Sequence, residues 1–369
     1  MKVLQTGTLL FVVLAIVGGL NAQGDLSPPS GPPGPVMKSL DEVEPRIQIS
    51  EAPFTITESG SYYFTQNVTG SEGQNGITIA EGVDNVTIDL MGYSLQGVEG
   101  SLHGIASADR WGTNDNVSIR NGGISGFAGD GIELAYFGRG RIIEEMVISE
   151  NGGHGIGWLR QGVVRSCIIS GNGGSGIRLQ SSVVVETCTI ADNRSTGVFG
   201  GTGNLIVNCI VTDNGSGISL GVENQVIDCV SRGNGNGIRV STGSRVSGST
   251  ASDNDAYGIL VSGPGGIPGT PPHGQRAVVV DSIADGNRGA GIAVRRIAAR
   301  VESNHVSRNE VGIKAESMRN LIVRNSAVGN TDANYEIVEG NEVGPIGTMA
   351  EVGEHPWANF SIGVPEEEQ

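Results

Sequence analysis

The chain has 369 residues, a formal net charge of −16, 60 glycines and only 4% aromatic residues. A surface this acidic repels nucleic acid and anionic lipid, so both are poor candidate partners. So much glycine would indicate disorder if it had no period. Here the glycines recur at regular intervals, and the Val and Ile residues between them can form a core.

Residues 1–22 have the features of a secretory signal peptide, with Lys2, an apolar run from Leu9 to Val17 and small residues at the exit, so cleavage is expected after Ala22. No later stretch approaches the roughly 20 apolar residues of a transmembrane helix. We therefore expect an exported protein without a membrane span that is secreted, periplasmic or at the cell surface. Loss of the one charged residue, Lys2, moves the net charge from −16 to −17.

Residues 23–37 are rich in Pro and Gly and are interpreted as a linker. Residues 38–75 contain the segment FTITESGSYYF and are interpreted as an N-terminal cap. A stack of parallel strands needs such a cap, because its terminal strands would otherwise expose unpaired edges.

The dominant pattern of the chain is a dipeptide, Gly-Ile or once Gly-Val, that begins at eleven positions: Gly76, Gly104, Gly131, Gly155, Gly176, Gly197, Gly217, Gly237, Gly258, Gly291 and Gly312. From Gly155 to Gly258 the interval is 20 or 21 residues. Earlier intervals are 24 to 28 residues, and one later interval of 33 includes the insertion GPGGIPGTPPHG. Apolar and polar residues alternate within the repeats, which indicates strands.

A repeat of this length built from strands predicts an all-β fold, a parallel β-helix (solenoid) of about eleven coils over residues 76–330. Residues 331–363 are expected to form a C-terminal cap, and residues 364–369 an acidic tail.

Two residue types recur in step with the repeat. An asparagine precedes each regular Gly-Ile pair and is expected to form a hydrogen-bonded ladder: Asn151, Asn172, Asn193, Asn214, Asn234 and Asn254. The four cysteines, Cys167, Cys188, Cys209 and Cys229, are 21, 21 and 20 residues apart. They should therefore form one column with neighbours about 4.8 Å apart. Parallel side chains do not converge as a disulfide requires, so buried thiols are predicted, with one or two bridges as the alternative.

The frame N-x-G-x-G-I, as in Asn172-Gly-Gly-Ser-Gly-Ile, resembles that of secreted right-handed parallel β-helix proteins, the pectate-lyase-like superfamily. The likeness runs from Gly76 to about Asn330. The flanking segments MKSLDEVEPR, PFTITESGSYYF and PWANF are similar to the ends of a bacterial subgroup with no assigned activity. The resemblance implies a right-handed helix. Because the superfamily includes lyases, hydrolases, epimerases and binding or adhesion modules, it implies no single activity.

Chemistry is expected where the repeat is irregular. The residue before Gly-Ile is His103, Asp130 and His154 in three successive coils. In one column, about 4.8 Å per step, these side chains can share protons or bind a divalent metal. We take them as the candidate catalytic residues. The alternative is that polar residues occupy these Gly-rich turns by chance.

The same coils carry aromatic residues and arginines. Aromatic faces stack on sugar rings, and arginines pair with carboxylates, which would suit a groove for an acidic glycan. The alternative is that the aromatic loops only pack on the flank of the solenoid. The candidate substrate-binding residues are Trp111, Tyr136, Trp158, Arg110, Arg139 and Arg160.

These residues match two known catalytic patterns only in part. Gly153-His154-Gly155 is similar to the Gly-His-Gly motif of polygalacturonase-type hydrolases, and Asp130 stands where that family has an Asp. However, His103 and Gly129 occupy positions where further Asp residues are expected, and no Arg-Ile-Lys follows. An inverting glycosidase needs two carboxylates, and here only Glu133 can supply the second.

A lyase instead needs a base and a cation, usually calcium. Asp192, Asp213 and Asp253 precede the asparagine column and leave calcium open as a cofactor, but Gly233 interrupts them.

The sequence therefore predicts an exported β-helix protein that binds extracellular polysaccharide. A non-catalytic surface or adhesion module is favoured, because the carboxylate pair is missing and the coils from Gly155 to Gly258 are plain. The alternative is a polysaccharide lyase or glycoside hydrolase acting on an acidic, uronate-containing glycan.

Overall fold

The computed structural model describes residues 46–262 and 276–363. The predicted signal peptide, the linker, the first part of the N-terminal cap and the acidic tail lie outside the described residues. Within the described residues, no helix is long and apolar enough to cross a membrane.

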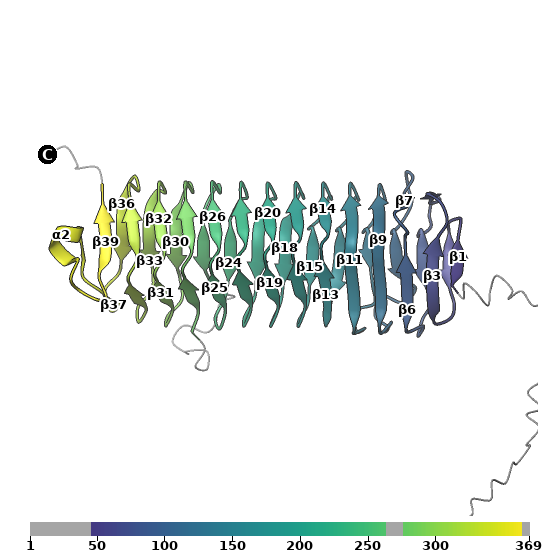
Figure 1. Cartoon of the computed structure of the whole chain (residues 1–369), viewed down its shortest axis with the longest axis horizontal. Coiled ribbons are helices and arrows are strands. Elements are labelled where there is room, and N and C mark those ends of the chain that lie inside the picture. Colours follow the sequence, from purple (N-terminus) through teal and green to yellow (C-terminus); the bar gives the residue numbers. More distant parts are fainter. Residues whose placement is uncertain (1–45, 263–275, 364–369) are drawn as a thin grey trace, which may run out of the picture. The chain divides into compact units, whose positions relative to one another are not determined.

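Each regular coil contributes three short strands, and each strand pairs in parallel with its equivalents in the neighbouring coils (Figure 1). In one plain coil these are β16 (Val184–Glu186), β17 (Thr189–Ala191) and β18 (Thr196–Gly200). Stacking of equivalent strands produces three parallel ladders.

The first ladder contains β1 (Ile47–Ile49), β3 (Gly60–Phe64), β6 (Val86–Asp89), β9 (Val117–Ser125), β11 (Arg141–Ser149), β13 (Gly162–Arg165), β16, β19 (Leu205–Val207), β22 (Gln225–Ile227), β25 (Arg245–Ser247), β28 (Val278–Val280), β31 (Arg300–Glu302), β34 (Leu321–Val323) and β37 (Glu342–Val343). The second contains β4 (Val68–Thr69), β7 (Ser94–Gln96), the later halves of β9 and β11, β14 (Ile168–Ser170), β17, β20 (Ile210–Thr212), β23 (Val230–Arg232), β26 (Thr250–Ser252), β29 (Ile283–Asp285), β32 (His305–Ser307), β35 (Ser326–Val328) and β39 (Asn359–Ile362), with β38 (Ile346–Gly347) beside β39. Because β9 and β11 belong to both ladders, they join the two into one sheet.

The third ladder is a separate sheet of thirteen strands among the described residues. It contains β2 (Phe54–Ile56), β5 (Ile77–Ile79), β8 (Ile105–Ser107), β10 (Ile132–Glu133), β12 (Ile156–Leu159), β15 (Ile177–Leu179), β18, β21 (Ser216–Leu220), β24 (Ile238–Val240), β27 (Ile259–Val261), β30 (Ala290–Val294), β33 (Val311–Ala315) and β36 (Ala333–Ile337). Successive Gly-Ile pairs lie on adjacent strands of this sheet, as predicted; Ile177, for example, pairs with Val198. The strands β2 and β36 come from segments interpreted as caps and lengthen the ladder at both ends.

The Gly-Ile pair has a steric explanation. The isoleucines point into the solenoid, and Ile156, Ile177 and Val198 are completely buried. A Cβ at Gly176 would lie 2.7 Å from the carbonyl oxygen of Gly197 in the next coil, so only glycine permits this close approach of neighbouring coils.

The predicted asparagine ladder is confirmed. Asn193, for example, donates its backbone N–H and a side-chain N–H to Oδ1 of Asn214, at 3.0 and 2.9 Å. The ladder continues beyond the regular coils through Asn287, Asn309 and Asn330. Buried amides thereby satisfy turn N–H groups that would otherwise lack partners.

The cysteine column is also confirmed, because the cysteines directly precede the paired residues Ile168, Thr189, Ile210 and Val230 of neighbouring coils. All four are buried and free. The column then changes chemistry without losing register. The backbone N–H of Cys229 donates to Oγ of Ser249, and the following members are Ser282, Asn304 and Asn325. Thiol, hydroxyl and amide side chains thus occupy equivalent buried positions. At the C-terminal end, the short helix α2 (Met349–Val352) packs against β38 and β39.

Candidate functional site

The candidate site lies in the turns before β8, β10, β12 and β15, where the predicted column does form. Each side chain accepts a hydrogen bond from the backbone N–H of the next member of the column. Asp130 donates to Nδ1 of His103 at 2.9 Å, His154 donates to Oδ1 of Asp130 at 2.6 Å, and Ser175 donates to Nδ1 of His154 at 2.8 Å. One atom of each side chain therefore holds the coils together, and the other remains for chemistry.

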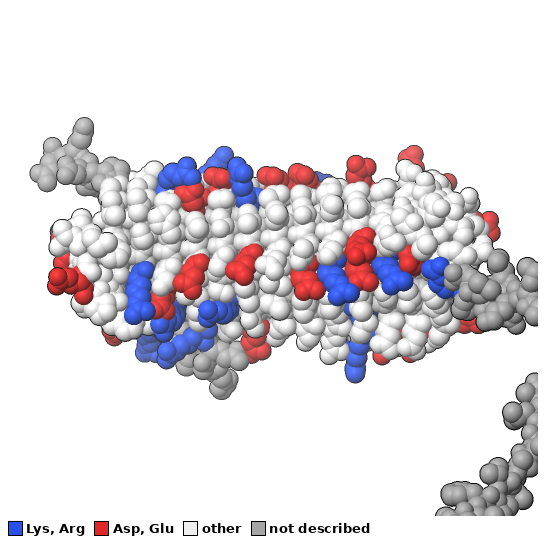
Figure 2. Space-filling view, viewed as in Figure 1, with Lys and Arg blue, Asp and Glu red and all other residues white. Residues whose placement is uncertain are grey.

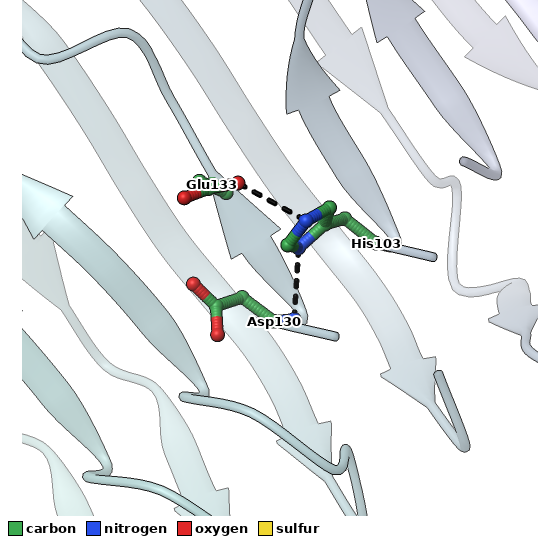
Figure 3. A group of neighbouring side chains, drawn as sticks. All are labelled: His103, Asp130 and Glu133. Atoms are coloured by element: carbon green, nitrogen blue, oxygen red, sulfur yellow. Dashed lines mark hydrogen bonds and ion pairs between the residues drawn. The ribbon is translucent and has the colours of Figure 1, made fainter. Parts of the chain in front are cut away.

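These bonds assign the proton of His103. Since Nδ1 accepts a backbone N–H, the single proton of the neutral ring lies on Nε2. Nε2 is 3.1 Å from Oε2 of Glu133, to which it donates (Figure 3). The other oxygen of Glu133 is 3.2 Å from Nε of Arg110. Glu133 is therefore ion-paired with Arg110 and accepts a hydrogen bond from His103.

His103, Asp130 and Glu133 present one potential ligand atom each within 4.8 Å of one another, and they are the only such group of three among the described residues. The hydrogen-bond pattern does not favour a metal here. Nδ1 of His103 is occupied by a backbone N–H, its Nε2 bears a proton, and Glu133 is already neutralised by Arg110. A metal ion would have to displace these partners.

The contact between His154 and Arg178 differs from the hydrogen bonds of the column, because two donor groups face each other. Nε2 of His154 lies 3.1 Å from Nη1 of Arg178, while Nδ1 already accepts the N–H of Ser175. The neutral ring therefore directs an N–H at a guanidinium N–H. Burial lowers the pKa of His154 below its ordinary value of 6.5, the nearby carboxylate of Asp130 raises it, and the charges of Arg178 and Arg110 lower it further. Burial also lowers the pKa of Arg178. Two donors thus converge on a point where an acceptor would satisfy both.

A β-bulge beside this point directs an aromatic ring over the site. Ile156 pairs with Ile177 and Leu159 with Leu179, so two residues of β12, Gly157 and Trp158, lie opposite one residue of β15. Trp158 takes a left-handed backbone conformation with φ of 47°. Its ring lies under the guanidinium of Arg178, 3.8 Å from the centroid. Bulges re-aim side chains in this way.

The predicted aromatic residues form one cluster. The ring centroid of Tyr136 lies 5.2 Å from that of Trp111 and 5.9 Å from that of Trp158. Phe137 packs edge-on against Tyr136 at 5.0 Å. Trp111 is 63% exposed, and Arg110 lies over its ring at 5.7 Å. The cluster therefore presents open aromatic faces beside the column.

Arg141, fully buried at the start of β11, supports this aromatic loop. Its Nη2 donates to the carbonyl of Ala135, directly before Tyr136, and its Nε donates to the carbonyl of Asn114 at 3.4 Å. Burial lowers its pKa to about 10. Arg141 fixes the backbone that carries Tyr136.

The other predicted residues lie apart from this arrangement. The backbone N–H of Arg139 donates to Asp115, and the side chain of Arg139 is exposed. The side chain of Arg160 makes no hydrogen bond, ion pair or cation–π contact with the column or the aromatic cluster among the described residues. Asp192, Asp213 and Asp253 adopt left-handed turn conformations with φ of 55°, 56° and 52° and form no three-ligand group within the described chain.

Sequence reasoning missed Arg178. Arg178 follows Gly176 by two residues, as Glu133 follows Gly131. Side chains at this position of the repeat point outward from the third ladder. Comparison of that one position across the coils would have found Arg178.

The family model for the right-handed β-helix region matches residues 103–250. No curated protein sequence matches the chain. Three similar solved structures are the A-module of the mannuronan C-5 epimerase AlgE6 of Azotobacter vinelandii, the periplasmic alginate epimerase AlgG and the catalytic domain of a GH87 α-1,3-glucanase. Their TM-scores are 0.57, 0.53 and 0.54, at 16%, 13% and 11% sequence identity. The matches cover 87%, 80% and 84% of this chain and 89%, 79% and 71% of the others.

At these identities the likeness concerns the fold. Together with the family model, it shows that the chain has the right-handed parallel β-helix fold that the sequence predicted.

Proposed function

We propose that the protein is an enzyme acting on an acidic polysaccharide, and that it removes the proton next to the carboxylate of a uronate residue. The observation that carries this proposal is the convergence of His154 Nε2–H and the Arg178 guanidinium. A carboxylate oxygen placed beside both nitrogens can accept from both groups and would relieve the donor–donor conflict. Arginine is also well suited to carboxylates, because its planar fork matches their geometry.

In the proposed step, the Asp130 carboxylate takes the proton from the carbon that bears the uronate carboxylate. Its Oδ1 is held by the N–H of His154, which leaves Oδ2 for the proton. The electron pair left on carbon moves into the carboxylate, where the cation of Arg178 and the N–H of His154 stabilise the added charge. An epimerase returns a proton to the opposite face, whereas a lyase expels the neighbouring glycosidic oxygen.

The distance between the carboxylates argues against an inverting glycosidase, and the partners of Glu133 argue against a retaining one. Inverting enzymes hold their carboxyl groups about 6.5–9.5 Å apart, whereas ligand oxygens of Asp130 and Glu133 lie within 4.8 Å of each other. Glu133 is also ion-paired with Arg110 and bonded to His103, so it is neither a free acid nor a free nucleophile. The predicted hydrolase alternative is therefore the weaker one.

Two of the similar structures belong to proteins named as epimerases of mannuronan or alginate, which is compatible with uronate chemistry on this fold. The predicted non-catalytic module gains no comparable support, because within the described coils the convergence of His154 and Arg178 occurs at one position and is not repeated.

The test follows exchange of the uronate proton. The purified chain would be incubated with polymannuronate, polyguluronate and polygalacturonate in D2O, with and without calcium. Proton NMR would report deuterium incorporation, and ultraviolet absorbance would report unsaturated ends. Exchange that disappears in Arg178→Met supports the proposal. Uronate binding without exchange in any polymer would overturn it and restore the non-catalytic module.

A further inference from the structure

The positive charge of this acidic protein is concentrated in its C-terminal coils. Residues 239–324 contain 11 Lys and Arg against 7 Asp and Glu, a net charge of +4. Since the whole chain has a net charge of −16, all other residues together carry −20. Figure 2 shows blue side chains gathered at the lower left of the view, toward the C-terminal coils. The candidate site lies several coils away, around β8 to β15.

Three of these arginines line one cavity of 410 Å³ on the first ladder: Arg276, Arg300 and Arg319. They belong to the neighbouring strands β28, β31 and β34 or to the residues just before them. Arg300 is ion-paired with Glu302. The exposed side chains of Arg276 and Arg319 have no hydrogen-bond or ion-pair partner among the described residues. The one acidic residue that lines the cavity is Glu342. The cavity therefore carries excess positive charge.

A second cavity of 440 Å³ adjoins the first, since both are lined by Leu321 and Glu342. Its other lining residues include Val323, His355 and Trp357. Trp357 is 43% exposed. The guanidinium of Arg324 lies over the Trp357 ring, 4.2 Å from its centroid, so only the opposite face can take a ligand. The combined groove thus has cations at one end and one face of an aromatic ring at the other.

We propose that this groove is a second binding site for a segment of acidic polysaccharide, separate from the candidate catalytic site. Arg276 and Arg319 would pair with uronate carboxylates, and the ring of Trp357 would stack on a sugar face. The proposal rests on the proposed function for the class of polymer. A second point of attachment would hold a long chain near the catalytic coils and raise its effective concentration there.

An acidic glycan fits the groove better than nucleic acid does. Nucleic acid binding needs an extended set of cations along a phosphate backbone, whereas this cavity is lined by three arginines, one of them ion-paired, in a protein of net charge −16. The adjoining Leu321, Val323 and Trp357 provide apolar and aromatic surface for the C–H faces of a sugar.

The test uses the full chain with Arg178→Met, so that binding at the candidate site is removed. Binding of polygalacturonate and polymannuronate oligomers would be measured by calorimetry for this background and for Arg276→Gln/Arg319→Gln and Trp357→Ala made in it. Because exposed ion pairs contribute modestly, Kd should rise up to about fivefold per arginine. Thermal melts would show that each variant is folded.

The matched control is Arg194→Gln/Arg288→Gln, which removes the same charge from exposed turns next to the asparagine ladder and should leave Kd unchanged. Equal loss in this control, no effect of Trp357→Ala, or equally tight binding of duplex DNA would overturn the proposal. The wild-type background separates the two hypotheses. If the protein exchanges the uronate proton but Arg276→Gln/Arg319→Gln binds the polymer as tightly as wild type, the second site is contradicted and the proposed function stands. If binding depends on these arginines but no exchange occurs, the proposed function is contradicted and the second site stands.

Discussion

Two regions of the solenoid have the same coil geometry but different hydrogen-bond acceptors for their turn N–H groups. They are the site coils around β10 and β12 and the plain coils around β18 and β21. In the plain coils, the turn N–H of Ser216 donates to the backbone carbonyl of Ser195 at 3.1 Å. In the site coils, the equivalent N–H groups of Asp130 and Ser175 donate to imidazole nitrogens. The structural and chemical interpretations of the column are therefore compatible, because each side chain uses one atom for the ladder and has a second polar atom within the candidate site.

One position on the outward face of the third ladder is adapted to the site. In the plain coils it carries Phe199 in β18 and Ser219 in β21. In the site coil of β12 it carries Gly157, where a Cβ would lie 2.5 Å from Oδ2 of Asp130. Glycine at this coil thus leaves room for the carboxylate.

The largest effect is expected for Asp130→Asn. The amide oxygen can still accept the N–H of His154, so the ladder should persist, but the amide cannot take a proton. Loss of a general base typically costs 10²- to 10⁴-fold, and proton exchange should fall by about 10³-fold, measured by NMR in D2O. In a plain coil, Asp213→Asn should leave exchange unchanged. Retention of full exchange by Asp130→Asn would assign the base to another residue.

The next largest effect is expected in the plain coils, for Asn214→Ala. Oδ1 of Asn214 accepts from Asn193, and its Nδ2 donates to the carbonyls of Ile190 and Thr212 at 3.1 and 2.8 Å. Because leaving a buried polar group unsatisfied costs about 1–3 kcal/mol, the free energy of unfolding in urea should fall by about 3 kcal/mol.

Asn236→Ala is the control for that change, since the side chain of Asn236 makes no hydrogen bond within the described chain. It should change the free energy of unfolding by less than about 0.5 kcal/mol. Equal losses at Asn214 and Asn236 would mean that the ladder contributes little.

The repeat made most of this architecture predictable, because equal coil lengths place like residues in columns. The ends were harder. Phe54 and Ala333 begin strands of the third ladder without a preceding Gly-Ile pair, so the pattern did not include them. Within the site, counting residues predicted the column through Asp130. It did not predict the bulge at Trp158. An extra residue in one strand is recognised only when its pairing with the neighbouring strand is known.

A smaller effect is expected for Cys209→Ser. The same column holds Ser249, whose Oγ accepts from Cys229 and donates to the carbonyl of Ser247 at 3.1 Å. A hydroxyl at position 209 can make the equivalent bonds to Cys188 and Val207. We expect a loss of about 1 kcal/mol in urea unfolding, the usual scale of one hydrogen bond. A loss above about 3 kcal/mol would show that the column does not tolerate hydroxyl groups interchangeably.

The smallest effect is expected in the pH dependence of stability. Burial lowers the pKa of His154 in the folded chain below 6.5, while in the unfolded chain it returns to about 6.5. Between these values the unfolded state binds more protons, so the free energy of unfolding should decrease as pH falls below about 6.5. His154→Gln should flatten this slope, because an amide does not titrate. The same change at exposed His305, in the plain coil of β32, should preserve it. A slope unaltered by His154→Gln would mean that the ring is not desolvated, and the convergence of His154 with Arg178 would then lose its electrostatic basis.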